Sequence, residues 1–108
     1  MQCEKTKFWP NCTYDENGKL HSYQDKPAVT NCYNNLLWYK HGEIHRDNDL
    51  PAIVRNNGTK KWLVNNCFHR TTGPAIIHSD GKKEYWIHGV KYSKFLFQIY
   101  KTIYMLKN

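Results

Sequence analysis

The sequence predicts a mainly β fold, an array of three to four stacked antiparallel β-hairpins of about 23–24 residues each, with a C-terminal capping α-helix. Two observations support this prediction. A block of sixteen residues without insertions opens with Pro-Ala at Pro27, Pro51 and Pro74. An aromatic residue stands eleven residues after each proline, at Trp38, Trp62 and Tyr85. A period of 20–50 residues is typical of arrays in which each unit buries its apolar face only against its neighbours.

The whole chain is expected to form one domain, with a lead-in at 1–13, β-hairpin repeats at 14–92 and the helix at 93–108. A length of 108 residues allows one modest core and leaves no room for a second. The aromatic content of 15% argues against disorder, because disordered chains are poor in aromatic and β-branched residues.

The chain begins with an incomplete unit. Phe8-Trp9-Pro10 is the one apolar anchor of the lead-in, which is expected to be irregular or a short strand. Tyr14 takes the aromatic position of the unit, Asn17-Gly18 takes its turn, and His21 takes the place of a recurring histidine.

Each fuller unit combines a β-prone run, a turn, a returning strand and a second turn. The first turns are expected at Tyr33-Asn34, Asn57-Gly58 and Asp80-Gly81. Asn-Gly and Asp-Gly are strong hairpin signals, because both central residues of a type I′ turn need positive φ. The second turns stand at His41-Gly42, Asn65-Asn66 and His88-Gly89, where Gly or Asn in the second place indicates a left-handed backbone. Isolated hairpins are marginally stable, so stacking must supply the stability.

The C-terminal segment departs from the repeat and predicts a helix with Ser93 as its N-cap. Apolar residues recur there at helical spacing, at Tyr92, Phe95, Leu96, Ile99, Ile103 and Leu106. The helix is expected to close the open end of the stack, because an uncovered sheet edge invites association. Phe97, Tyr100 and Tyr104 fall outside this stripe, and the contact surface for a second copy or a partner is predicted at Phe95, Phe97, Tyr100 and Tyr104.

The net charge of +7 is concentrated in the second half of the chain. Residues 1–54 hold six Lys and Arg against seven acids, whereas residues 55–108 hold ten against two. Such a field favours acidic partners, nucleic acid or anionic membrane surfaces, and it also serves solubility. The residues expected to contact nucleic acid, interleaved with aromatic side chains, are Arg55, Lys60, Lys61, Arg70, Lys82 and Lys83.

The four cysteines predict a reducing compartment. Cys3, Cys12, Cys32 and Cys67 are irregularly spaced and form no Cys-x-x-Cys pair. No signal peptide precedes them, and no run approaches the roughly 18 apolar residues of a membrane span. We therefore expect a cytoplasmic protein, or a virion component, that is neither secreted nor membrane-spanning.

The recurring histidines and arginines are interpreted mainly as parts of the fold. His21, His45 and His69 occupy equivalent places, and each is expected to bond the backbone of the next loop. Zinc binding with a nearby cysteine is the alternative, but a repeat delivers parallel ligands, whereas those of one site converge from unlike positions. Arg46 and Arg70 follow two of these histidines and are expected to stack on a neighbouring aromatic ring, in preference to recognising carboxylate or phosphate.

The unit resembles the MORN-type β-hairpin repeat, in the variant found in multiple copies in large DNA viruses and some phages. The residues that carry the resemblance are Trp38-Tyr39-Lys40-His41-Gly42-Glu43-Ile44-His45-Arg46 and Gly73-Pro74-Ala75 with Asp80-Gly81. The departures are Ser22 after His21, Lys26 and Leu50 before proline, and Asn66 in the turn. The resemblance covers about residues 12–93 and implies a scaffold, in a family whose members often self-associate and in some cases contact acidic lipids. It brings no catalytic residues.

Taken together, these features predict a non-catalytic module for protein–protein interaction or assembly that forms a homo-oligomer through the helix or an open edge. A viral structural or host-interacting role is one form of it. The alternative is electrostatic binding of nucleic acid, or of acidic lipid, by the basic half. No catalytic, cofactor-binding or metal residue is assigned and no small-molecule substrate is expected, because the chain has no phosphate loop or nucleophile motif and an open array lacks a deep cavity.

Overall fold

The computed structural model describes residues 11–31 and 33–107, apart from the side chains of Met105 and Lys107. Residues 1–10, which hold most of the predicted lead-in, lie outside this description, as does Cys32. The described chain is mainly β, with antiparallel hairpins and a single helix at its C-terminal end, as the sequence predicted.

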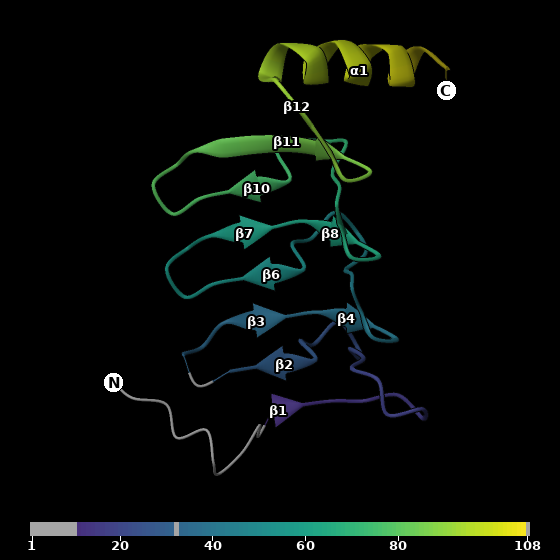
Figure 1. Cartoon of the computed structure of the whole chain (residues 1–108), viewed down its shortest axis with the longest axis vertical. Helices are drawn as coiled ribbons and strands as arrows, with labels where there is room; N and C mark the ends of the chain where they lie inside the picture. The colour runs from purple at the N-terminus through teal and green to yellow at the C-terminus, as the bar shows by residue number, and fades with distance from the viewer. Residues whose placement is uncertain (1–10, 32, 108) are drawn as a thin grey trace.

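The strands of the main sheet follow one another along the long axis of the molecule (Figure 1). Eight strands pair antiparallel, in the order β1-β2-β3-β6-β7-β10-β11-β12. Their bounds are Asn11–Cys12 (β1), Val29–Thr30 (β2), Leu36–Leu37 (β3), Ile53–Val54 (β6), Lys60–Lys61 (β7), Ile76–Ile77 (β10), Lys83–Ile87 (β11) and Val90–Tyr92 (β12). Because neighbours in sequence are mostly neighbours in space, each hairpin is placed against the next one along the chain.

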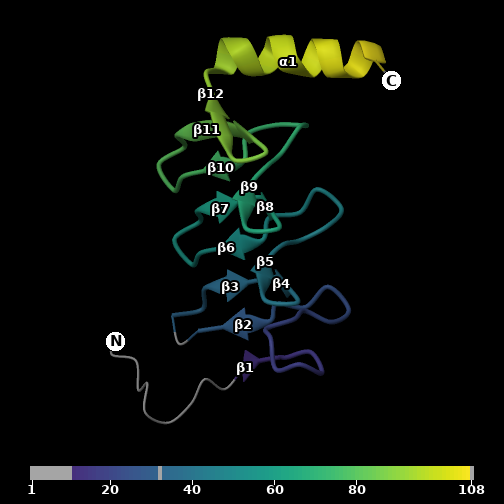
Figure 2. The same ribbon diagram turned by 45° about the vertical axis from the view of Figure 1, so that its right-hand side comes forward.

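Two small hairpins lie beside the main sheet (Figure 2). One pairs β4 (Tyr39–Lys40) with β5 (Glu43–Ile44), and the other pairs β8 (Leu63–Val64) with β9 (Cys67–Phe68). A buried tryptophan joins each small hairpin to the main sheet, Trp38 between β3 and β4 and Trp62 between β7 and β8. Strand β11 is longer and runs through the equivalent position without a break.

The two kinds of turn differ in backbone geometry. The second turns have positive φ at both central residues, as in type I′ turns: 47° and 89° at His41-Gly42, 49° and 69° at Asn65-Asn66, and 49° and 79° at His88-Gly89. In the first turns only the second residue is left-handed, at Asn34, Gly58 and Gly81, so the expected type I′ pair is wrong at Asn57-Gly58 and Asp80-Gly81. In these two turns a backbone hydrogen bond closes a loop of three residues. At Asn57-Gly58, the amide of Arg55 donates to the carbonyl of Thr59.

The alanine after each proline is completely buried. Ala28, Ala52 and Ala75 have no exposed surface, and each donates its amide to a strand of its own hairpin. The carbonyls of Ala52 and Ala75 accept the amides of Trp38 and Trp62, which binds one hairpin to the next. A small side chain is needed here because the backbones approach closely on both sides, which explains the recurrence of Pro-Ala.

The core is a thin layer shared between neighbouring hairpins. Trp38, Ala52, Ile53 and Leu63 form a buried cluster, with half-buried residues packed against it that include Ile44 and Phe68. The expected structural positions Trp38 and Trp62 are buried, while Tyr85 and the three prolines are half-buried.

Helix α1 (Lys94–Lys107) lies across one end of this elongated molecule, next to β11 and β12 (Figure 1). The amide of Leu96 donates to Oγ of Ser93 at 3.2 Å, which is the N-cap that the sequence predicted. The molecule measures 50 × 34 × 20 Å. No helix in residues 11–31 and 33–107 has the length and hydrophobicity needed to cross a bilayer.

Candidate functional site

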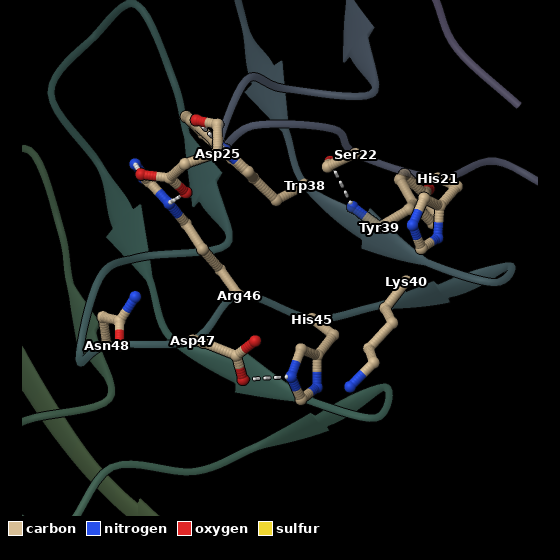
Figure 3. Close-up of a pocket in the computed structure, with 10 residues that line it drawn as sticks. All are labelled: His21, Ser22, Asp25, Trp38, Tyr39, Lys40, His45, Arg46, Asp47 and Asn48. Carbon is tan, nitrogen blue, oxygen red and sulfur yellow. Dashed lines mark hydrogen bonds and ion pairs between the residues drawn. The ribbon is translucent and has the colours of Figure 1, made fainter.

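One face of the array carries a layered contact of tryptophan, arginine and aspartate (Figure 3). The guanidinium carbon of Arg46 lies 3.7 Å from the ring centroid of Trp38. Nε and Nη2 of Arg46 donate to the two carboxylate oxygens of Asp25 at 2.9 and 3.0 Å, and Nη1 donates to the carbonyl of Pro51. The indole Nε1 of Trp38 donates to the backbone carbonyl of Asp25. Asp25 therefore holds both members of the stack.

The same contact recurs one hairpin further along the chain. Arg70 lies 3.9 Å above Trp62, and its Nε donates to Asp49 at 2.9 Å. Nη1 of Arg70 donates to the carbonyl of Pro74, and the hydroxyl of Thr72 donates to Asp49 at 2.7 Å. The expectation that these arginines stack on an aromatic ring is confirmed.

The pattern of the repeat did not predict the roles of Asp25 and Asp49. The hydrogen bond from Arg46 holds the pKa of Asp25 below its ordinary value. Partial burial raises the pKa of Asp49, but the hydrogen bonds from Arg70 and Thr72 outweigh it, so this pKa is also lowered. A signal was present, since each aspartate stands two residues before a proline and 21 residues before its arginine.

The recurring histidines bond the next loop, as expected. The Nδ1 atom of each accepts a backbone N–H, which requires a neutral ring protonated at Nε2. The three bonds run from the amide of His41 to His21 (3.0 Å), from Asn65 to His45 (3.1 Å) and from His88 to His69 (2.9 Å). Nε2 of His45 also contacts Asp47 at 2.7 Å, and in this tautomer it donates the bond. These hydrogen bonds join each loop to the next one, so the histidines contribute to the stacking of the hairpins.

Shallow grooves separate the successive loops on this face. The groove in Figure 3 has a volume of about 270 Å³ and lies between His21, Trp38, His45 and Arg46. The equivalent groove one hairpin further, lined by Trp62, His69 and Arg70, measures about 250 Å³. Both are open to solvent, and their arginines are already paired with aspartates. Lys40 also lines the first groove, whereas no lysine of the described chain lines the second.

A larger groove of about 610 Å³ lies near the start of α1. Four lysines line it together with Tyr85, Tyr92 and Glu84, namely Lys82, Lys83, Lys91 and Lys94. Glu84 is ionised and already partnered, because hydrogen bonds from His78 and Trp86 lower its pKa. Lys91 lies 3.6 Å from Glu84 and is partly neutralised. The groove remains basic.

The six residues expected to contact nucleic acid are not equivalent. Arg55, Lys60, Lys82 and Lys83 are exposed, and Lys61 is half-buried on β7. The guanidinium of Arg70 is occupied by Trp62, Asp49 and Pro74, so it is not free for a phosphate. Arg70 therefore belongs to the fold, which corrects its expected place in this surface. Lys91 and Lys94 take its place around the basic groove.

Helix α1 faces the array with two of the four side chains that were expected to contact a partner. Phe97 is only 1% exposed and packs on Tyr85, with ring centroids 4.8 Å apart. Tyr100 is half-buried and its ring lies 6.0 Å from that of Tyr92. The expected contact surface is therefore wrong at Phe97, which is part of the core, while Phe95 and Tyr104 are exposed as expected. The aromatic rings of β11 and β12 receive aromatic partners from the helix.

The opposite side of α1 exposes the apolar stripe. Its exposed side chains are Phe95 (71%), Leu96 (51%), Ile99 (42%), Ile103 (51%) and Leu106 (81%). Contiguous exposed apolar surface is typical of protein or membrane contact sites and of ligand grooves. We name Leu96, Ile99, Ile103 and Leu106 the seam. Their 3-4-3 spacing is that of the a and d positions of a coiled coil.

Metal-ligating side chains meet at one place in the described chain, which shares His21 with the first groove. Asp15, His21 and His41 have ligand atoms that all lie within 4.8 Å of one another. Oδ2 of Asp15 lies 2.6 Å from Nδ1 of His41. The hydrogen bonds from His41 and from the backbone amide of Lys19 lower the pKa of Asp15 to about 2.

No family model, curated protein or solved structure matches this chain.

Proposed function

We propose that this protein is a non-catalytic assembly module, an array of three to four stacked hairpins of the MORN-like type that pairs with a second copy of itself through the seam of α1. The observation that carries the proposal is the exposure of Leu96, Ile99, Ile103 and Leu106 on the side of the helix that faces away from the array. An a/d seam buries its side chains when a second helix packs against it.

The chemistry beside the seam favours a second copy as its occupant. Of the positions that flank it on the helix, Phe95, Tyr100 and Thr102 carry no charge, and Lys107 at its C-terminal end is the one cation. Along most of the seam two identical helices can therefore meet without bringing like charges together. A short helix of 14 residues is marginal alone, but here Phe97 anchors it to the array.

The position of the lysines argues for a protein partner over a bilayer. Lys94 and Lys101 are seven residues apart, so they share one face of the helix, and Phe97 between them turns that face toward the array. In helices that lie in a membrane interface, basic residues form the polar face that stays in contact with the headgroups. Lys101 is half-buried instead.

The test is light scattering on the purified full chain at low and high salt. We expect a dimer at both, because the seam is apolar and uncharged. The double substitution Ile99→Ser with Ile103→Ser should give a monomer with unchanged circular dichroism. Tyr33→Ser is the matched control, since Tyr33 is also exposed but lies far from the helix, and this variant should stay dimeric. A monomeric wild-type chain at tens of micromolar would refute the proposal.

The basic groove favours a second candidate, the binding of single-stranded nucleic acid. Lys82, Lys83 and Lys94 stand beside Tyr85 and Tyr92, and a combination of positive charge with aromatic side chains is typical of grooves that bind single strands. Binding to an arbitrary oligonucleotide should weaken steeply with added salt and be lost in Lys82→Glu with Lys83→Glu, while dimerisation is unaffected. Retention of the oligonucleotide independent of salt would count against this candidate.

A further inference from the structure

We propose that Asp15, His21 and His41 form a binding site for a divalent transition metal ion, with zinc as the best fit. The site lies at the end of the array opposite to α1. It is independent of the assembly proposed above, so either can fail without the other.

The three side chains come from unlike positions in the hairpins. Asp15 follows the aromatic position of the incomplete first unit, His21 is its recurring histidine, and His41 belongs to the turn between β4 and β5. The sequence argument against a metal site was that a repeat delivers parallel ligands. That argument does not apply to this group, because its members converge from different places.

The distances suit one ion after a small adjustment. Ligand atoms bonded to a tetrahedral zinc ion at ~2.0–2.2 Å lie about 3.3–3.6 Å apart. The three ligand atoms lie within 4.8 Å of one another, and Oδ2 of Asp15 lies 2.6 Å from Nδ1 of His41. The imidazole rings of His21 and His41 are 4.2 Å apart between centroids. A small rearrangement of these side chains would bring all three to a common ion.

Asp15 is held in place for this role. Its side chain is 1% exposed, and its Oδ1 accepts the backbone amides of Asn17 and Lys19 at 2.8 and 2.9 Å. Oδ2 is thereby directed at the two imidazoles. Because the pKa of Asp15 is about 2, the carboxylate is ionised at neutral pH and needs to release no proton to bind a cation.

The proton balance of binding follows from the hydrogen bonds. Nδ1 of His41 donates to the ionised Asp15, so its proton must leave to solvent before the nitrogen can bind the ion. Nδ1 of His21 already presents a lone pair, which accepts the amide of His41 and would turn to the ion instead. His41 is more than half exposed, which leaves a fourth position for water.

The chain contains its own control for this site. His69 and His88 repeat the geometry of His21 and His41, with ring centroids 4.2 Å apart and the amide of His88 donating to His69 at 2.9 Å. The position equivalent to Asp15 is there taken by Leu63, and the pair belongs to no metal-ligating group in the described ranges. Stacking of the hairpins therefore does not need the buried carboxylate, and at His45 it does not need a second histidine either, because Asn65 donates the equivalent amide.

The donor set indicates the class of ion. Two imidazole nitrogens and one carboxylate oxygen suit zinc, cobalt and nickel, whereas magnesium and calcium prefer oxygen ligands alone. Three protein ligands with one open position are typical of exchangeable zinc sites.

The experiment titrates zinc into the chelator-treated full chain by calorimetry, and cobalt by its visible absorption. We expect one ion per chain, release of about one proton, and cobalt bands of tetrahedral intensity. His41→Asn should weaken zinc binding at least tenfold, and Asn65 shows that asparagine is accepted in the equivalent turn. Asp15→Asn should do the same, with circular dichroism as the check that it folds.

His88→Asn is the matched control and should bind zinc like the wild type. The proposal is overturned if the wild-type chain takes up no zinc at a hundred micromolar. It is also overturned if His88→Asn weakens binding as much as His41→Asn, because the zinc would then be bound by surface histidines in general.

Discussion

At the scale of single residues, Arg70 connects three parts of the chain. Its guanidinium stacks on Trp62, pairs with Asp49 from the preceding link and caps the carbonyl of Pro74 in the next hairpin. The planar fork of arginine is needed for this, because an ammonium group cannot stack and donate to two oxygens at fixed angles. The residue is conspicuous in the sequence as a positive charge, yet its role is in packing.

Arg70→Lys should therefore lower the free energy of unfolding by about 1–2 kcal/mol, although the charge is kept. Urea denaturation at neutral pH measures the change. Arg55→Lys is the control, since Arg55 is exposed in a turn, and surface changes of this kind stay within about 0.5 kcal/mol. Equal effects of the two substitutions would show that the stack contributes nothing.

His69 makes the stability depend on pH. Burial and the nearby His88 lower its pKa below the ordinary value of 6.5. The unfolded chain therefore binds more protons than the folded chain below about pH 6.5, so stability should fall as the pH falls through this range. Asp15 does not contribute there, because its pKa is lowered from 3.8 to about 2 and the stability that it adds is lost only below about pH 4.

The urea midpoint should accordingly decrease between pH 7 and pH 5, and His69→Gln should make this decrease smaller. His88→Asn should retain most of the decrease, because burial is the larger cause of the shift. An unchanged slope in His69→Gln would exclude His69 as the titrating group.

At the scale of elements, helix α1 has apolar side chains on both of its sides. Phe97 and Tyr100 lie toward the array, whereas Leu96, Ile99 and Ile103 are exposed. Periodicity identifies the longer stripe, but it does not tell which stripe meets the sheet. The choice follows from the rings of Tyr85 and Tyr92, which leave room for aromatic partners.

Phe97→Ala should consequently destabilise the protein by about 3–5 kcal/mol and loosen the helix from the array. Thermal unfolding followed at a helical and at an aromatic wavelength would measure both effects. Phe95→Ala is the matched control, because Phe95 is largely exposed and its truncation should cost little in the monomer. Similar losses in the two variants would contradict the observed docking of the helix.

At the scale of the whole molecule, the array is elongated, and its positive charge is concentrated in the second half of the chain. The array is 50 Å long, and its Cα radius of gyration of 15.7 Å exceeds the roughly 13 Å of a compact chain of this length. The helix stands at the end of this axis, where nothing in the described chain covers its outer side (Figure 1). A partner can therefore approach the seam without meeting the hairpins.

Pairing through the seam should join two arrays end to end. Small-angle X-ray scattering should then give a maximum dimension of roughly 100 Å, twice the 50 Å length of one chain. The variant with Ile99→Ser and Ile103→Ser should return to about the length of one chain. A compact dimer, in which the arrays lie side by side, would place the interface on the sheet edges or the basic half and not on α1.

The features that the sequence determined are those that depend on neighbouring residues. The spacing of Pro-Ala, the left-handed turns at Gly42 and Gly89 and the cap at Ser93 follow from backbone geometry and hydrogen bonds over a few positions. They were therefore predicted correctly, as was the bond of each recurring histidine to the next loop.

Only the tertiary structure decided the features that join distant residues. The pairing of Arg46 with Asp25 spans 21 residues, and the contact of His41 with Asp15 spans 26. Their formation depends on how far one hairpin is displaced against the next, which no local pattern records. The buried side of α1 was decided in the same way, because an apolar stripe gains free energy from any surface that excludes water, and only the shape of β11 and β12 selected Phe97 for that surface.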